Sequence, residues 1–123
     1  FKIMAFILIV DDSNTMRQMV QFTLTEAGHE VIEARDAAEA MQHLQLNKFD
    51  LVISDVNMPG MNGIDLVKEI RTMPEYKFTP VLVLTTESEQ EIKQRGRAAG
   101  ATGWIVKPFN PEVLLSVLGK ELG

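Results

Sequence analysis

The chain is predicted to fold as a three-layer α/β domain, with helices covering both faces of a five-stranded parallel sheet. Five short apolar runs recur along the 123 residues, and a stretch with helix signals follows each of them. This alternation implies parallel strands joined by right-handed crossovers. Runs such as FILIV at 6–10 are apolar throughout, which is typical of strands that are buried on both faces.

The elements are expected in the following order. Strands are expected at 6–10, 30–34, 50–54, 80–85 and 104–106. Helices are expected over 14–27, from 36 onward, over 64–71, from 88 onward and from 110 onward. Asp36 with Glu39 and Ser88 with Glu91 have the spacing of capping boxes. Gly28 stands where a helix C-terminal cap belongs.

Composition indicates one globular domain that spans residues 1–123, with residues 1–3 preceding a natural start at Met4. The length suits a single hydrophobic core, and 46% hydrophobic with 24% charged residues is ordinary for a folded chain. The net charge of -5 disfavours a nucleic-acid partner. The absence of cysteine excludes disulfides and thiol nucleophiles. The longest apolar run, 3–10, is far shorter than the roughly 18 residues that cross a bilayer. We therefore expect a cytoplasmic protein without a membrane partner.

Polar residues stand at the carboxyl ends of four of the predicted strands. They are Asp11 and Asp12, Asp55, Thr85 and Thr86, and Lys107. Each of these acids could simply cap the next helix. Ligands of open parallel sheets, however, bind beyond the carboxyl ends of the strands. If the four strands are neighbours, one pocket holds three carboxylates, a hydroxyl group and an ammonium group.

Such a pocket requires a cation or a proton to offset the repulsion among its carboxylates. Two carboxylates about 4 Å apart repel by roughly 4 kcal/mol at an effective dielectric of 20, and Lys107 supplies only one positive charge. Mg²⁺ fits because it binds carboxylates, water and phosphate oxygens. The pattern predicts phosphoryl transfer, with Asp55 as a nucleophile that forms an aspartyl phosphate.

Four motifs carry a family resemblance: VDDS at 10–13, SDVNMPGMNG at 54–63, LTTE at 84–87 and GWIVKPF at 103–109. In this order and spacing, the chain resembles a receiver domain of two-component signalling, most closely the stand-alone chemotaxis regulators of the CheY type. CheY is a standard example of the flavodoxin-like sandwich with strand order 2-1-3-4-5, so the resemblance supplies that order. It implies a signal transducer and not an enzyme, one that assists its own phosphorylation and slow autodephosphorylation.

The resemblance also assigns the metal ligands and the phosphoacceptor. Asp55 accepts the phosphoryl group. Asp12 and Asp55 bind Mg²⁺ together with the backbone carbonyl group of Asn57, and Asp11 acts through a bound water molecule.

The resemblance gives further positions roles in phosphoryl binding and switching. Thr85 donates a hydrogen bond to the phosphoryl group, and Lys107 pairs with one of its oxygens. Trp104 stands where the family places an aromatic switch residue, commonly the smaller Tyr or Phe. Asn57 and Glu87 tune the lifetime of the phosphate. Because Asn57 has no titratable proton, it cannot speed hydrolysis as an acid or base, and we expect a persistent phosphoryl group.

The partners implied by the resemblance are proteins. A histidine kinase donates the phosphoryl group, and a phosphatase removes it. A downstream protein, with the flagellar motor switch as the candidate, binds the face formed by residues 89–99, 104–106 and 111–120.

Three alternatives belong to other functional classes. A haloacid-dehalogenase-like phosphatase would need Asp-x-Asp after the first strand, but Asp55 follows the third and its second neighbour is Asn57. A flavodoxin binds a flavin phosphate after the first strand, where Asp11 and Asp12 would repel it. The chain could also be a receiver fragment of a transcription factor or hybrid kinase, although its end at 122–123 without a linker favours a free-standing protein.

Overall fold

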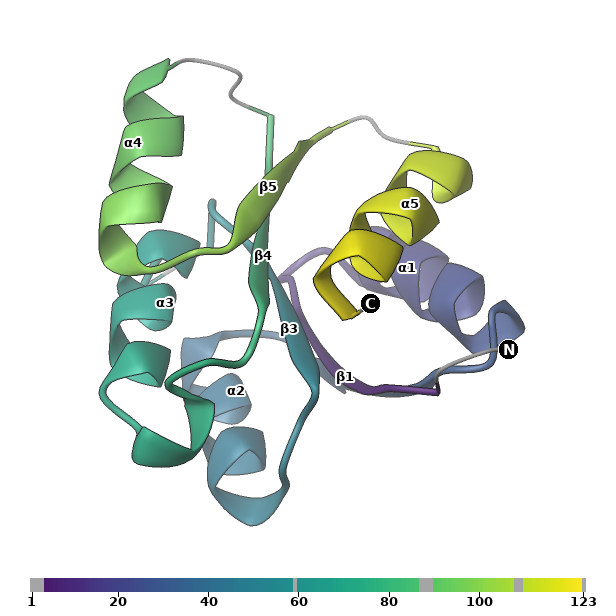
Figure 1. Ribbon diagram of the computed structural model, residues 1–123, viewed down its shortest axis with the longest axis horizontal. Coiled ribbons are helices and arrows are strands. Elements are labelled where there is room, and N and C mark those ends of the chain that lie inside the picture. Colours follow the sequence, from purple (N-terminus) through teal and green to yellow (C-terminus); the bar gives the residue numbers. More distant parts are fainter. Residues whose placement is uncertain (1–3, 59, 87–89, 108–109, 123) are drawn as a thin grey trace.

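The architecture is a central parallel sheet between two layers of helices, as Figure 1 shows. The computed structural model describes residues 4–58, 60–86, 90–107 and 110–122. The strands are β1 (Phe6–Val10), β2 (Glu30–Ala34), β3 (Leu51–Asp55), β4 (Val81–Thr85) and β5 (Gly103–Val106). The helices are α1 (Asn14–Glu26), α2 (Ala37–Leu46), α3 (Gly63–Arg71), the 3₁₀ turn η1 (Pro74–Tyr76), α4 (Gln90–Ala99) and α5 (Pro111–Leu122).

The strand order is β2-β1-β3-β4-β5, and all neighbouring strands are parallel. This confirms the order expected from the resemblance. Helices α1 and α5 lie on one side of the sheet, and α2, α3 and α4 lie on the other (Figure 1). No helix in the described ranges is both long enough and apolar enough to pass through a membrane.

Both faces of the central strands are buried, which explains their continuous apolar sequences. Consecutive strand residues point to opposite faces. Leu8 and Val52 therefore join the core beneath α2 and α3, whereas Ile7, Ile9 and Ile53 join the core beneath α1 and α5. All five residues are fully buried. The carboxyl ends of these strands are thus held in a rigid, close-packed layer.

Several predicted boundaries need small corrections. β3 covers Leu51–Asp55 and not 50–54, so Asp55 is its last residue. Asp50 precedes the strand, and its carboxylate accepts a hydrogen bond from the backbone amide of Phe6 at 2.8 Å. Pro80 also precedes its strand, although its carbonyl group accepts from the amide of Val52 at 3.0 Å. The strand β5 begins one residue early, and the turn η1 was not predicted.

The predicted helix caps are largely confirmed. The Asp36 carboxylate accepts from the backbone amide of Glu39 at 2.8 Å at the start of α2. Asn110 caps α5 through the amide of Val113 at 2.8 Å. Gly28 ends the α1 segment with φ +97°, a conformation that favours glycine. The capping box expected to begin at Ser88 lies outside the described residues.

Candidate functional site

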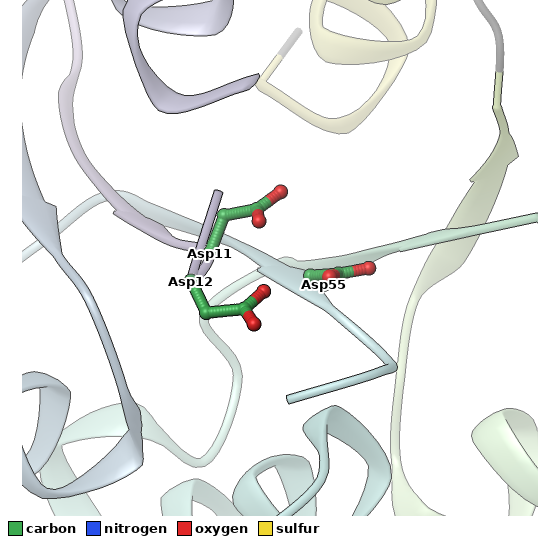
Figure 2. Close-up of side chains that lie close together, drawn as sticks. All are labelled: Asp11, Asp12 and Asp55. Carbon is green, nitrogen blue, oxygen red and sulfur yellow. The ribbon is translucent and has the colours of Figure 1, made fainter. Parts of the chain in front are cut away.

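Three carboxylates meet at the carboxyl ends of two adjacent strands. Asp11 and Asp12 follow β1, and Asp55 ends the neighbouring strand β3. Each residue offers one carboxylate oxygen, and the three oxygens all lie within 4.8 Å of one another. Figure 2 shows the three side chains leaving these strand ends and extending toward the same side. The structure therefore brings together the acids that the sequence predicted would converge.

The three acids differ in exposure. Asp11 is 0% exposed and Asp55 is 5% exposed, so both belong to the wall of the site. Asp12 is exposed and lies at its rim. Of the three acids, Asp12 is therefore the most accessible to a ligand from solvent.

Lys107 follows β5 and provides the counter-charge. Its Nζ lies 3.0 Å from Oδ1 of Asp55 and 3.4 Å from Oδ2 of Asp11. The Lys107 side chain is only 13% exposed, so these interactions are partly shielded from solvent. Within the described ranges, it is the one side-chain cation at ion-pair distance from these acids.

The environment of Asp11 disfavours the ionised form of its carboxyl group. Burial raises the pKa of its carboxyl group above the usual value, and repulsion from Asp55 raises it further. The backbone amide of Ser13, which donates to Oδ1 at 2.9 Å, and the ammonium group of Lys107 act in the opposite direction. The pKa nevertheless remains raised.

The donor set fits a small, hard divalent cation. Two ionised carboxylates 4.8 Å apart repel by roughly 3.5 kcal/mol at an effective dielectric of 20, and one lysine offsets only part of the charge of three acids. Oxygen ligands from carboxylates are those that Mg²⁺ prefers. Asp12 and Asp55 are placed to provide them, and Asp11 lies behind them. Asn57 is exposed in the loop after Asp55, and the role of its carbonyl group stays a prediction.

The β3–α3 loop folds tightly against the end of β3. The Gly63 amide donates to the carbonyl oxygen of Val56 at 2.9 Å. A Cβ atom at Gly63 would lie 2.1 Å from the carbonyl oxygen of Asp55, closer than any real contact. Glycine at this position therefore allows the loop to pack against the backbone that carries Asp55. The sequence did not predict this requirement, because the contact depends on how the loop folds back onto β3.

The predicted switch residues lie on the two neighbouring strands. Thr85 ends β4 and is 1% exposed; its carbonyl group accepts from the backbone amide of Lys107 at 2.7 Å. Trp104 in β5 is partly buried. The Lys93 Nζ and the Arg97 Cζ lie 5.3 Å and 5.4 Å from the centroid of its ring, within the range of cation–π attraction. Glu87, the second predicted lifetime-tuning position, lies outside the described residues.

Thr85 and Trp104 both line a small cavity. It has a volume of about 10 Å³, roughly the space that one water molecule needs. The lining residues are Val56, Ile64, Val83, Thr85, Lys93, Gly96 and Trp104. An indole ring is far larger, so Trp104 could move inward only if α4, which contributes Lys93 and Gly96, moved as well.

The family model of the response regulator receiver domain matches residues 7–119. The chain belongs to this family. The receiver domain is 42% identical over 119 residues to a chemotaxis protein CheY homolog of Campylobacter jejuni, covering 95% of this chain and 92% of that protein. It is 45% identical over 115 residues to chemotaxis protein CheY-3 of Vibrio cholerae, covering 93% and 88% of the two chains.

A solved structure has the same fold. The chemotaxis protein CheY4 of Vibrio cholerae matches with a TM-score of 0.95 and 56% sequence identity, covering 98% of this chain and 100% of that chain. The resemblance expected from the four sequence motifs is thereby confirmed, together with the fold. The match to a receiver family does not favour the phosphatase or flavodoxin alternatives.

Proposed function

We propose that this receiver domain takes a phosphoryl group from a histidine kinase onto Asp55 and then changes its partner-binding face, in the control of chemotaxis. The observation that carries the proposal is the environment of Asp55. This acid ends the central strand β3, lies 3.0 Å from the ammonium group of Lys107, and shares the site with two further carboxylates. The family and the chemotaxis relatives support the same function.

The transfer step needs a nucleophile that is held still. A carboxylate oxygen of Asp55 attacks the phosphorus atom of the phosphohistidine. As the new P–O bond forms, the P–N bond breaks, and its electron pair remains on the leaving imidazole nitrogen. The rigid strand holds Asp55 in place, and Lys107 neutralises charge on a phosphoryl oxygen, so the chain contributes mainly position and electrostatics.

Mg²⁺ would be held by Asp12, Asp55 and the carbonyl oxygen of Asn57, with Asp11 acting through water. When bound, the ion neutralises negative charge on the acids and on the transferring group. Asp11 and Asp12 supply the carboxylates that attract it. Asn57 has no acidic proton, so it cannot assist hydrolysis of the aspartyl phosphate, and the phosphoryl group persists.

The switch couples the phosphorylated acid to the face formed by α4, β5 and α5. The added phosphate carries about two negative charges, toward which the hydroxyl group of Thr85 moves. Trp104 then moves inward, and because the cavity behind it is so small, α4 shifts with it. The exposed side chains Val106 and Val113 lie on this face, where the downstream protein, with the flagellar motor switch as the candidate, would bind.

The remaining assignments concern lifetime and place of action. As a receiver of this family, the protein is a signal transducer and not a classical enzyme. We infer that Glu87 tunes the phosphate lifetime, that a separate phosphatase ends the signal, and that the protein acts in the cytoplasm. Slow autodephosphorylation would then set the upper limit of the signal lifetime.

Phosphorylation with a small donor tests the proposal. The protein is incubated with Mg²⁺ and acetyl phosphate, and the modified residue is located by mass spectrometry. We expect one phosphoryl group on Asp55, loss of incorporation in Asp55→Asn, and normal incorporation in Asp65→Asn, which removes an exposed acid of α3. Incorporation that persists unchanged in Asp55→Asn would refute the assignment, and steady turnover of small phosphate esters would favour the phosphatase alternative.

A further inference from the structure

Arg17 is a charged residue on the buried face of α1, where it is 7% exposed. Its guanidinium group reaches the backbone beneath the acidic site. Nη1 donates to the carbonyl oxygen of Asp11 at 2.6 Å, and Nη2 donates to the side-chain oxygen of Asn14. Nε lies 3.5 Å from the carboxylate of Glu33 in β2. Arg17 thus ties together the end of β1, the start of α1 and the edge strand.

The contact with Asp11 completes a set of bonds that immobilises this residue. The Asp11 amide donates to the carbonyl oxygen of Ala34 at 3.1 Å. Its carboxylate accepts from the Ser13 amide and faces Lys107. Arg17 holds the remaining polar group, the carbonyl oxygen. Every hydrogen-bonding group of Asp11 is therefore engaged.

The bond to the Asp11 carbonyl group also affects the next residue. A peptide group is planar, so fixing the carbonyl of Asp11 fixes the direction in which the chain enters Asp12. Within the described part of the chain, the Asp12 carboxylate has no hydrogen bond or ion pair of its own. Its position near Asp55 therefore depends on the backbone that Arg17 holds.

We propose that Arg17 is a positioning residue for the metal site. It orients the Asp11–Asp12 peptide so that the carboxylate of Asp12 stays beside that of Asp55. The inference rests on the magnesium site of the proposed function and adds a residue outside the ligand set. Arginine suits this task because its planar fork can bond several oxygens in fixed directions, which the single ammonium group of a lysine cannot do.

Charge and position make opposite predictions for Arg17. A positive charge close to a cation site weakens cation binding, so a residue that acted by charge alone would, on removal, leave a site that binds Mg²⁺ more tightly. A residue that acts by position would, on removal, leave a looser site. Partners of this kind typically change metal affinity by 10–100-fold, so we expect Arg17→Met to bind Mg²⁺ about tenfold more weakly.

The test is a calorimetric titration of the unphosphorylated protein with Mg²⁺, at a temperature well below the unfolding midpoint of every variant. Arg17→Met is compared with Arg17→Lys, which keeps the charge and a single ammonium group as donor. Arg17→Lys should recover part of the affinity. Arg35→Met is the matched control, because Arg35 is 73% exposed and pairs only with Glu39 among the described residues. It removes the same charge and should leave the affinity unchanged.

A second variant covers the case in which Arg17→Met does not fold. Asn14→Ala removes an exposed partner of the guanidinium group and leaves the charge in place. We expect a smaller loss of Mg²⁺ affinity in the same direction. If Arg17→Met or Asn14→Ala binds Mg²⁺ as tightly as the wild type or more tightly, the positioning role of Arg17 is refuted, while the metal site itself is not. A wild-type protein that binds no Mg²⁺ would overturn the metal site of the proposed function, and this inference with it.

Discussion

Replacing Asp12 by asparagine is expected to stabilise the protein in the absence of divalent cations. Asp12 is exposed at the rim of the site and, among the described residues, has no counter-ion to lose. Lys107 pairs with Asp11 and Asp55 and with no other described acid. The Asp12 carboxylate therefore contributes mainly repulsion to the folded state.

The size of this repulsion follows from the geometry. The oxygens of Asp12 lie within 4.8 Å of those of Asp11 and Asp55. Because Asp12 is exposed, the dielectric of water applies, and each pair repels by about 0.9 kcal/mol. At low ionic strength, Asp12→Asn should therefore raise the free energy of unfolding by about 1–2 kcal/mol. Physiological salt, with a Debye length of about 8 Å, should reduce the gain to about half.

Urea unfolding followed by circular dichroism, with a chelator and then with Mg²⁺, measures both effects. For a slope of about 1–3 kcal/mol per molar urea, the midpoint without metal should rise by roughly 0.3–2 M. Mg²⁺ should stabilise the wild type by binding only the folded state, and the variant much less. The control Glu30→Gln removes an exposed charge at the amino end of β2, away from the carboxyl ends that carry the site, and should have little effect on stability. A variant that is no more stable than the wild type without metal would refute the reasoning.

Two further predictions concern the backbone and the buried acid of the site. Gly63→Ala places a Cβ atom 2.1 Å from the carbonyl oxygen of Asp55 and should lower the free energy of unfolding by about 1–3 kcal/mol. The control Gly119→Ala has open space around its Cβ atom on α5 and should raise the free energy of unfolding by up to about 1 kcal/mol. Equal effects of the two substitutions would contradict the close-contact argument. Because burial raises the pKa of Asp11 above its ordinary 3.8, the folded state holds its proton more tightly than the unfolded state, and stability falls as pH rises from 3.8 through the raised pKa. Asp11→Asn should therefore be more stable than the wild type at neutral pH without metal. Denaturant titrations should show this difference in stability shrinking as the pH is lowered toward 3.8. A difference that does not change with pH would show that the raised pKa of Asp11 is not its cause.

The parts of the fold that were predicted accurately follow from neighbouring residues along the chain, such as apolar runs and helix caps. The apolar runs of β1, β3 and β4 are buried on both faces, as continuous hydrophobicity indicated. Asp36 and Asn110 cap the helices that they were expected to begin. The start of β3 was misplaced by one residue at Asp50, whose side chain accepts a hydrogen bond from Phe6, 44 residues away. Pairing across that distance leaves no local signal.

The site likewise contains residues that the sequence predicted and one that it did not. Asp11, Asp12, Asp55 and Lys107 could be found from the sequence because each lies at or just beyond the carboxyl end of a strand, and parallel strands end at one edge of the sheet. The buried contacts of Arg17 were not predicted, although one signal was present. It lies three and seven positions before Val20 and Leu24, on the same buried stripe of α1, where a charged residue requires partners.

The sequence by itself determined the layered α/β architecture, the convergence of the acids and the type of cation they suit, because burial and strand ends follow from the order of residues along the chain. Only the tertiary structure decided which two acids pair with Lys107 and which acid lies exposed at the rim. It also decided how small the cavity lined by Thr85 and Trp104 is, and what holds the backbone beneath the site. These properties depend on distances between segments that are remote in the sequence. Such distances are set by the packing of the whole domain.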